Sequence, residues 1–162
     1  MNIKIIKPSE NHIPQMVKLG DESRQHHIDV MHGYFKPVTP ISSGFEEKII
    51  RTHMNETESN IIFIAVDKND NVVGMILGEK LYKPWLEKSH VGHVSNFIVS
   101  GEVRGQGIGK KLMDAFVKEC KKSGLYEIDL GVYNQNKTAY DFYIKYGFEP
   151  IEQKMHLKII TR

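Results

Sequence analysis

Residues 99–111 shape the interpretation of this chain more than any other stretch: they read Val99-Ser100-Gly101-Glu102-Val103-Arg104-Gly105-Gln106-Gly107-Ile108-Gly109-Lys110-Lys111. An apolar strand runs into a glycine-rich turn, which opens an amphipathic helix. Glycine lets the backbone turn sharply and leaves its N–H groups unshielded by side chains. The first N–H groups of a helix have no intrahelical partner and lie at the positive end of its dipole. The stretch therefore predicts an anion site, most often for a phosphate or pyrophosphate.

Two common glycine-rich phosphate motifs do not fit these residues. A Walker-type P-loop, Gly-x-x-x-x-Gly-Lys-Ser/Thr, would need a glycine at Arg104 and a hydroxyl at Lys111. A dinucleotide fold, Gly-x-Gly-x-x-Gly, would need its third glycine at Ile108 or Leu112. The stretch also lies well past the middle of the chain, whereas a dinucleotide motif opens its unit. Both nucleotide-binding interpretations are therefore poor.

Two motifs together resemble a known family. Arg104-x-x-Gly107-x-Gly109 resembles the pyrophosphate-binding signature Arg/Gln-x-x-Gly-x-Gly/Ala of the GNAT family of N-acetyltransferases. Residues 136–148 resemble the C-terminal signature of that family, Asn-x-x-Ala-x-x-x-Tyr-x-x-x-Gly-Phe. The two motifs stand in the order found in the family, and the resemblance covers residues 60–160. The chain is thereby identified as a member of this family.

Hydrophobic periodicity and turn residues divide the chain into strands and helices. We predict strands over residues 4–7, 61–66, 72–80, 90–99, 126–133 and 155–160, and helices beginning near residues 8–10 and 43 and spanning 107–123 and 135–146. Residues Ile28–Ser43 contain Gly33, Pro37 and Pro40 and predict a loop. This order predicts a mixed α/β fold. The resemblance implies a mixed, mostly antiparallel sheet flanked by helices, whose fourth and fifth strands splay apart to admit the pantetheine arm of acetyl-CoA.

Composition limits the class of protein. The chain has 162 residues, which favours one domain, and the resemblance implies that it is a single N-acetyltransferase domain over residues 1–162. The net charge of +2 gives no support for nucleic-acid or membrane partners. No apolar run approaches the roughly 20 residues needed to span a bilayer, and residues 1–7 do not resemble a signal peptide. The single cysteine, Cys120, has no disulfide partner in the chain, and its helical spacing indicates a buried thiol. We expect a reducing, cytoplasmic setting.

The resemblance implies how acetyl-CoA would bind. The main chain of the fourth strand would pair with the pantetheine amides, and the turn amides would hold the pyrophosphate. Lys110 and Lys111 either meet the 3′-phosphate or form a solvated helix face. Asn136 either approaches the pantetheine arm or only begins the last helix, where Asn134 offers a competing cap. The cofactor-binding residues so implied are Phe97, Ile98, Val99, Arg104, Gly105, Gln106, Gly107, Ile108, Gly109, Lys110 and Asn136.

Tyr143, in the second motif, is the candidate proton donor. Attack of an amine on a thioester expels a thiolate, which a phenol can protonate or hydrogen-bond. Ordinary pKa values of about 10 for a phenol and about 8.5 for a thiol make this exchange feasible near neutral pH. The alternative is a core aromatic residue that packs with Phe142 and Tyr146.

A proton acceptor is harder to assign. Many relatives carry a glutamate where this chain has Ser95, followed by Asn96, and neither side chain is a base near pH 7. His93 lies two residues earlier, hence on the same strand face, and could accept a proton through water. The alternatives are a structural role for His93, a base role for Glu79, or an acceptor that arrives already deprotonated.

The remaining histidines show no metal-binding spacing, so we expect no metal site. His26, His27, Asp29 and His32 lie in the region that borders the acceptor pocket in relatives. Together with Tyr34 and Phe35 they either shape acceptor specificity or form a polar surface loop.

These observations predict transfer of an acetyl group from acetyl-CoA to a primary amine by direct attack in a ternary complex, with proximity supplying much of the acceleration. The acceptor is either a small-molecule amine or a protein amine. A non-catalytic acyl-CoA-binding sensor is the alternative from another class. Nucleic-acid binding through the face of Lys110–Lys122 gains little from a balanced charge. Homodimers are common in such folds, and nothing in the sequence establishes one.

Overall fold

The computed structural model describes residues 2–31, 34–35, 40–157 and 159. The chain forms two compact units, residues 1–131 and residues 132–162, and each is described by itself. The first unit contains, in chain order, β1 (Lys4–Ile6), a 3-10 turn η1 (Glu10–His12), α1 (Ile13–Val30), α2 (Pro40–Asn55), β2 (Asn60–Val66), β3 (Val72–Tyr82), β4 (His90–Val99), η2 (Gly101–Val103), α3 (Ile108–Lys122) and β5 (Glu127–Leu130). The second unit contains α4 (Lys137–Tyr146).

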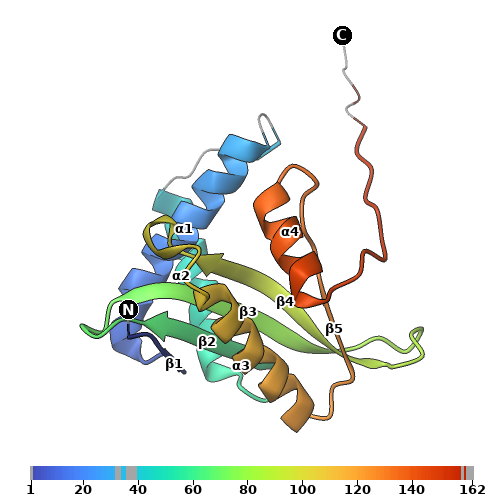
Figure 1. The fold of residues 1–162 in the computed structure, drawn as a ribbon, viewed down its shortest axis with the longest axis horizontal. Helices are drawn as coiled ribbons and strands as arrows, with labels where there is room; N and C mark the ends of the chain where they lie inside the picture. Colours follow the sequence, from blue (N-terminus) through green and yellow to red (C-terminus); the bar gives the residue numbers. More distant parts are fainter. Residues whose placement is uncertain (1, 32–33, 36–39, 158, 160–162) are drawn as a thin grey trace. The chain divides into compact units, whose positions relative to one another are not determined.

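The first unit is built on a mixed five-stranded sheet in the order β1-β2-β3-β4-β5 (Figure 1). All neighbours are antiparallel except β4 and β5, which are parallel. The β4–β5 pairing runs from Val91 opposite Glu127 to Val94 opposite Leu130 and then stops, whereas β4 continues to Val99. The expected mixed sheet with separating fourth and fifth strands is confirmed.

Strand β4 carries one extra residue. Val94 pairs with Gly78 and Asn96 pairs with Leu77, so Ser95 has no place in the β3–β4 register and forms a bulge. Cross-strand partners share a face of the sheet. The bulge therefore lets both halves of β4 keep their apolar side chains in register with β3.

Helices cover both faces of this sheet (Figure 1). The core between the sheet and the N-terminal helices includes Met16 from α1, Ile50 from α2, and Met75 and Leu77 from β3, all fully buried. The amphipathic helix predicted over residues 107–123 is confirmed, since Ile108, Leu112, Phe116 and Cys120 form a buried stripe along α3.

Three sheet glycines make room for α3. A Cβ at Gly78 would lie 2.7 Å from Phe116, and a Cβ at Gly92 would lie 2.6 Å from the Cys120 sulfur. At Gly74 a Cβ would lie 3.0 Å from Leu112. At Gly78 a Cβ would also clash with the His93 carbonyl, so a larger residue there would disturb the β3–β4 pairing as well as the packing of α3.

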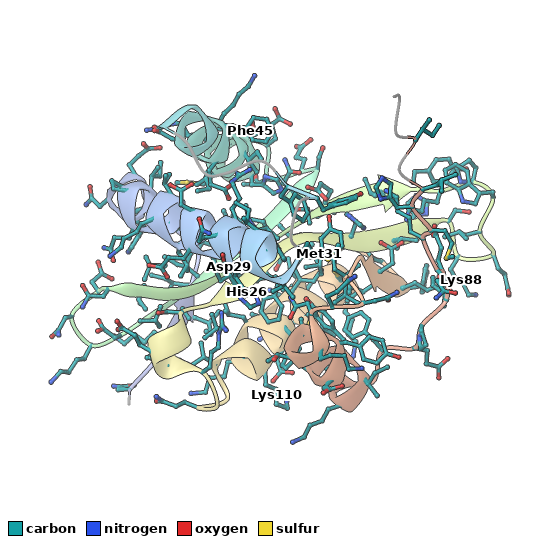
Figure 2. All side chains as sticks on the ribbon, turned by 90° about the horizontal axis from the view of Figure 1, so that it is seen from above. His26, Asp29, Met31, Phe45, Lys88 and Lys110 are labelled. Carbon is teal, nitrogen blue, oxygen red and sulfur yellow. The ribbon has the colours of Figure 1, made fainter. Side chains whose placement is uncertain are left out.

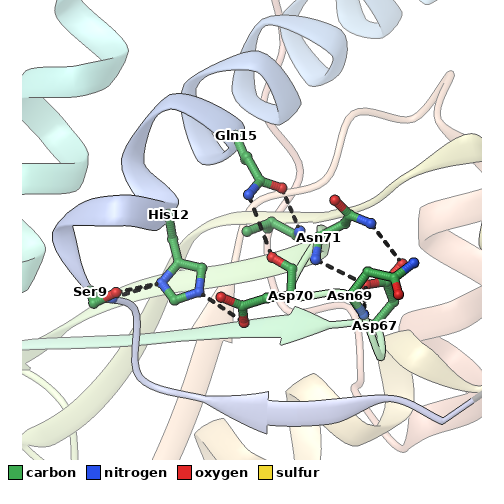
Figure 3. A network of polar contacts seen from close by, with 8 residues as sticks. Ser9, His12, Gln15, Asp67, Asn69, Asp70 and Asn71 are labelled. Atoms are coloured by element: carbon green, nitrogen blue, oxygen red, sulfur yellow. Dashed lines mark hydrogen bonds and ion pairs between the residues drawn. The ribbon is translucent and has the colours of Figure 1, made fainter.

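The strands predicted over residues 61–66 and 72–80 require a turn between them, which the structure confirms and which contacts α1 (Figure 3). The Asp67 carboxylate accepts the backbone N–H groups of Asn69 at 2.8 Å and Asn71 at 2.9 Å. Asp70 has a φ of 65°, a conformation that aspartate tolerates in turns. From α1, the Gln15 side chain donates to the Asp70 carbonyl at 3.5 Å.

The loop predicted over Ile28–Ser43 is wrong at both ends. Helix α1 continues to Val30, and α2 already begins at Pro40. Proline at a first helical position costs nothing, because its missing N–H would have no partner there. Gly33 and Pro37 lie outside the described residues.

Along α2, Phe45, Ile49, Ile50 and His53 are spaced for one apolar face, and this prediction is wrong only at Phe45. Phe45 (labelled in Figure 2) is 58% exposed, whereas Glu46 is buried together with Ile50 and His53. Arg24 and Asn96 hydrogen-bond Glu46 in the interior. A prediction from hydrophobicity alone therefore places Phe45, and not Glu46, on the buried face.

Near the C-terminus, the strand predicted over residues 155–160 is wrong for the described part, since 155–157 and 159 form no strand. Met155, Leu157 and Ile159 are all more than four-fifths exposed, so their alternating apolar side chains are not buried against a core. Strand β5 is also shorter than the predicted 126–133. Among the helices of the described chain, none is long and apolar enough to cross a membrane.

Candidate functional site

The glycine-rich turn has the backbone shape that its sequence predicts. Gly105 and Gly107 have φ values of 79° and 77°, in the left-handed region that favours glycine. Gly107 is the N-cap of α3, and no side chain of the described structure caps this helix. Its first amides are therefore left for a ligand, at the positive end of the helix dipole.

The space above this turn fits an anionic group. A Cβ built on Gly105 or Gly107 would meet no heavy atom within 4 Å, so the glycines face open space. Glycine is required at these two positions because of the positive φ, and not because neighbouring atoms would clash with a side chain. Uncapped amides facing open space match what a pyrophosphate needs, so the residues present fit this part of coenzyme A.

Two basic side chains near the turn are already engaged. The Arg104 Nε donates to the Val99 carbonyl at 3.0 Å, which ties the turn to the end of β4. Lys110 forms an ion pair with Asp114 at 2.8 Å, one helical turn further along α3 (Figure 2 labels Lys110). A phosphate would have to compete with Asp114 for the Lys110 ammonium.

The second half of β4 leads directly into this turn. Phe97, Ile98 and Val99 pair with β3 on one side, whereas the pairing with β5 ended at Val94. In a sheet, such a strand edge offers backbone N–H and C=O groups to an extended ligand. The three residues predicted to hold pantetheine therefore lie where β5 has ended.

His93 lies on the first half of β4 and is held by a carboxylate. Its Nδ1 lies 2.5 Å from Asp129 Oδ1 on β5, and Lys83 contacts the other Asp129 oxygen. The His93 side chain is 34% exposed. Burial raises the pKa of Asp129, but the hydrogen bonds from Lys83 and His93 outweigh it and leave that pKa below its usual value.

Glu79 pairs with a different histidine. It lies opposite His93 in the β3–β4 register, and its Oε1 is 2.9 Å from His53 Nε2 on α2. Burial raises the pKa of Glu79, yet hydrogen bonds from His53 and the Ser95 side chain leave it lowered overall. Ser95, which replaces the glutamate of many relatives, thus lies beside a carboxylate that comes from the neighbouring strand.

A third carboxylate, Glu46 of α2, is sealed. It accepts from Arg24 of α1 at 2.8 Å and from Asn96 of β4 at 3.1 Å. A Cβ at Gly20 would lie 2.5 Å from its Oε1, so α1 has a glycine where this carboxylate rests. Burial raises the pKa of Glu46, and Arg24 only partly offsets this.

The predicted acceptor region lies at the C-terminal end of α1. His26 and Asp29 are helical and not part of a loop (Figure 2). The His27 ring lies 6.0 Å from Phe35, and Phe35 meets Tyr34 edge-on at 5.0 Å. Burial, followed by the charges of His26 and Arg24, lowers the pKa of His27. His32 lies outside the described residues.

Tyr143 and Asn136 belong to the second unit. Tyr143 is 9% exposed and meets the Phe142 and Phe148 rings edge-on at 5.5 and 5.7 Å. Burial raises the pKa of Tyr143 to about 12, so its phenol keeps its proton. The Asn136 side chain accepts the Ala139 N–H at 3.2 Å, so Asn136 and not Asn134 caps α4.

Within the described residues, no three His, Cys, Asp or Glu side chains come together as a metal site. Sequence reasoning missed the partners of its own candidates: Asp129 and Lys83 beside His93, and His53 beside Glu79. In the sequence, Asp129 was only one residue of the strand predicted over residues 126–133. The parallel register of β4 and β5 places Asp129 opposite His93, and this register could not be inferred from the sequence.

Comparison with known proteins gives a consistent result. Residues 28–148 match the Acetyltransferase (GNAT) family. An uncharacterized N-acetyltransferase of Methanocaldococcus jannaschii is 31% identical over 101 residues, which is 62% of this chain and 45% of that protein. The chain thus spans less than two thirds of the length of the curated relatives it matches first.

Solved structures with a similar fold have low sequence identity. A mutant protein from Bacillus halodurans superposes with a TM-score of 0.84 at 19% identity, over 99% of this chain and 100% of that one. AAC(6')-Iy in complex with the bisubstrate analogue CoA-S-monomethyl-acetylneamine has a TM-score of 0.71 at 14% identity, over 99% and 100% of the two chains. These likenesses concern the fold alone.

Proposed function

We propose a function from one premise: this chain belongs to the acetyltransferase (GNAT) family, whose pattern its residues 28–148 match. The proposed activity is transfer of an acetyl group from acetyl-CoA to a primary amine by direct attack in a ternary complex. The observation that carries it is the turn at Gly105 and Gly107, which is left-handed, uncapped and open above. A fold neighbour that binds a bisubstrate CoA analogue supports the same donor.

In this proposal the chain binds coenzyme A through its backbone. The amides from Arg104 to Gly109 hold the pyrophosphate, and Lys110 approaches the 3′-phosphate in exchange for Asp114. Phe97, Ile98 and Val99 pair with the pantetheine amides along the edge of β4 opposite β3, beyond the end of the β5 pairing. Asn136 is proposed to approach the pantetheine arm through its side-chain N–H₂, since its oxygen caps α4.

The chain's own residues then move two protons. Acetyl-CoA supplies a reactive thioester, and holding the amine beside it removes the entropy of association. His93 takes the proton of the attacking amine, directly or through water. Tyr143 donates to the leaving sulfur, which its protonated phenol suits.

The acceptor is proposed as a small-molecule amine or a peptide amine. The cluster at the end of α1, which contains His27, Tyr34 and Phe35, would border it and set its identity. We also propose a single cytoplasmic N-acetyltransferase domain over residues 1–162. Burial raises the pKa of Cys120 to about 11, which supports a structural thiol and not a covalent nucleophile.

A titration of coenzyme A and acetyl-CoA into the full chain, followed by calorimetry, tests the binding half. Gly107→Ala forces an L side chain into a left-handed conformation at a cost of about 1–2 kcal/mol and should weaken binding by about tenfold. Gly101→Ala is the matched control, because a Cβ there meets nothing and no positive φ is present. Absence of any coenzyme A uptake by the native chain contradicts the proposal.

Thiol release from acetyl-CoA across a panel of amino sugars, polyamines, aminoglycosides and peptides tests the transfer half. Turnover with one class identifies the acceptor. Tight binding of acetyl-CoA with no turnover on any amine favours the acyl-CoA sensor instead.

A further inference from the structure

Three side chains from three neighbouring strand segments meet on the first half of β4. His93 Nδ1 contacts one oxygen of Asp129 on β5, and Lys83, just after β3, contacts the other oxygen. The side chains of Asp129 and Lys83 are each 23% exposed, so water only partly screens this contact. Both Asp129 oxygens are therefore engaged, and the carboxylate cannot turn away from the imidazole.

Hydrogen-bond chemistry fixes the imidazole proton. A carboxylate flanked by a lysine ammonium is an acceptor only, so the proton of this contact belongs to His93 Nδ1. Neutral His93 then carries its lone pair on Nε2. No described residue forms a hydrogen bond with Nε2, and the side chain is one-third exposed. The basic nitrogen is thus the one that a substrate or water can reach.

We propose that Asp129 is the positioning residue for His93: it holds the imidazole in the Nδ1–H form, so that Nε2 accepts the proton of the acceptor amine. This inference rests on the proposed acetyl transfer. In that step the amine nitrogen forms a bond to the acetyl carbon and the carbon–sulfur bond breaks. The electron pair leaves with sulfur, and the amine proton passes to His93 Nε2.

The protein contains a counter-example that makes the assignment testable. The Ser9 N–H donates to His12 Nδ1 at 3.0 Å, so His12 Nδ1 is an acceptor. Its Nε2, 3.3 Å from Asp70, then carries the proton. His12 and His93 both pair with an aspartate, and geometry dictates opposite tautomers for them.

The charged groups that face His93 are few. Asp129 comes from β5, Lys83 follows β3, and Glu79 lies opposite on β3 with its own partner His53 from α2. Removal of the Asp129 charge therefore leaves a lysine and a carboxylate–imidazole pair nearby. A variant that keeps the shape of Asp129 is needed.

Nitrogen NMR of the full chain with labelled histidine tests the positioning directly, without any acceptor. His93→Gln identifies the His93 signals by their loss. We expect the native protein to show His93 in the Nδ1–H form and His12 in the Nε2–H form at a pH where both are neutral. Asp129→Asn, of the same shape, should abolish the His93 preference, because an amide can donate to Nδ1 as well as accept from it.

Asp70→Asn is the matched control and should change the His12 signals while leaving those of His93 as they are. A native His93 in the Nε2–H form, or an Asp129→Asn variant with an unchanged His93 spectrum, would overturn the positioning role. This result is independent of turnover, so it stands apart from failure of the proposed activity.

Kinetics with an amine that turns over test the consequence. At pH 7, Asp129→Asn should lower kcat/KM for the amine by about tenfold or more while the KM for acetyl-CoA stays within about twofold. At about pH 9.5, where more of the amine arrives without its proton, the loss should shrink. An equal loss at both pH values would assign Asp129 a structural role only and contradict the proposal.

Discussion

The His53–Glu79 pair and the His93–Asp129 pair are both histidine–carboxylate contacts on the same face of one sheet, yet they differ in access. His53 is 7% exposed, and both of its ring nitrogens are engaged, one by the Ile49 carbonyl at 2.9 Å and one by Glu79. His93 is 34% exposed and uses only one nitrogen. The first arrangement holds α2 on the sheet, whereas the second leaves a basic nitrogen for chemistry. Both histidines contact a carboxylate, so the second ring nitrogen distinguishes their roles: in His53 it binds the Ile49 carbonyl, whereas in His93 it has no partner among the described residues.

The largest test of this contrast is His93→Gln. It should lower kcat on any accepted amine by a factor of about 10² to 10⁴ at pH 7, because general base catalysis contributes that much. The free energy of unfolding should fall by no more than about 1.5 kcal/mol, since the variant loses one hydrogen bond, to Asp129. Steady-state kinetics and urea unfolding measure the two effects. Full activity in this variant would remove His93 from the mechanism and favour an acceptor that arrives deprotonated.

The mirror experiment is His53→Leu. It leaves Glu79 half-buried without its main partner and should cost about 2–4 kcal/mol of unfolding free energy. His53→Gln, which can still donate to Glu79, is the matched control and should recover about half of that loss. Urea unfolding provides the measurement. If both variants are as stable as the native chain, the pair does not anchor α2.

The His53–Glu79 pair also predicts how stability depends on pH. The Ile49 carbonyl requires a proton on Nδ1, and the contact of Nε2 with Glu79 requires a second proton. Burial lowers the pKa of His53, but the hydrogen bonds to Glu79 and Ile49 raise it overall. Above pH 6.5 the unfolded chain loses the His53 proton while the folded chain keeps it, so stability falls until the folded pKa is passed.

On the acid side the sign reverses. The pKa of Glu79 is lowered in the fold, so below about pH 4.5 the unfolded chain takes up its proton first and stability falls as pH falls. Each group contributes at most about 1.4 kcal/mol per pH unit. Denaturation curves from pH 4 to about 9, compared with those of the His53→Gln variant, isolate the contribution. A native curve parallel to that of the variant above pH 6.5 would show that His53 is neutral in the fold.

The smallest expected effect belongs to Ser95→Ala. It removes one hydrogen bond to the Glu79 carboxylate and should cost about 0.5–1.5 kcal/mol. It should also raise the pKa of Glu79, so that the loss of stability on the acid side begins at a higher pH. Urea unfolding at pH 7 and pH 4.5 reads both changes. No change at either pH would mean that the hydroxyl contributes nothing to the His53–Glu79 pair.

Patterns that depend on one segment were predicted from the sequence. The α3 stripe, the turn at Asp67 and the bounds of β4 follow from periodicity and local turn chemistry, and the structure confirms them. The backbone shape of the turn before α3 followed from Gly105 and Gly107 in the same way.

Features that depend on contacts between segments were not predicted. Strict alternation along β4 does not reveal the extra residue Ser95, because a bulge is recognised only against its partner strand. The buried place of Glu46 depends on Arg24 and Asn96, which come from 22 and 50 residues away. The partners of His93 follow from the parallel register of β5, which no local pattern encodes.

The three glycines under α3 have a consequence at a distance. Helix α3 packs on the sheet at three successive points, where Leu112 lies over Gly74, Phe116 over Gly78 and Cys120 over Gly92. A methyl group at Gly92 would lift the far end of that helix and tilt it about Leu112. This tilt would also move the turn before α3, so a substitution within the sheet would alter the proposed phosphate site without contacting it.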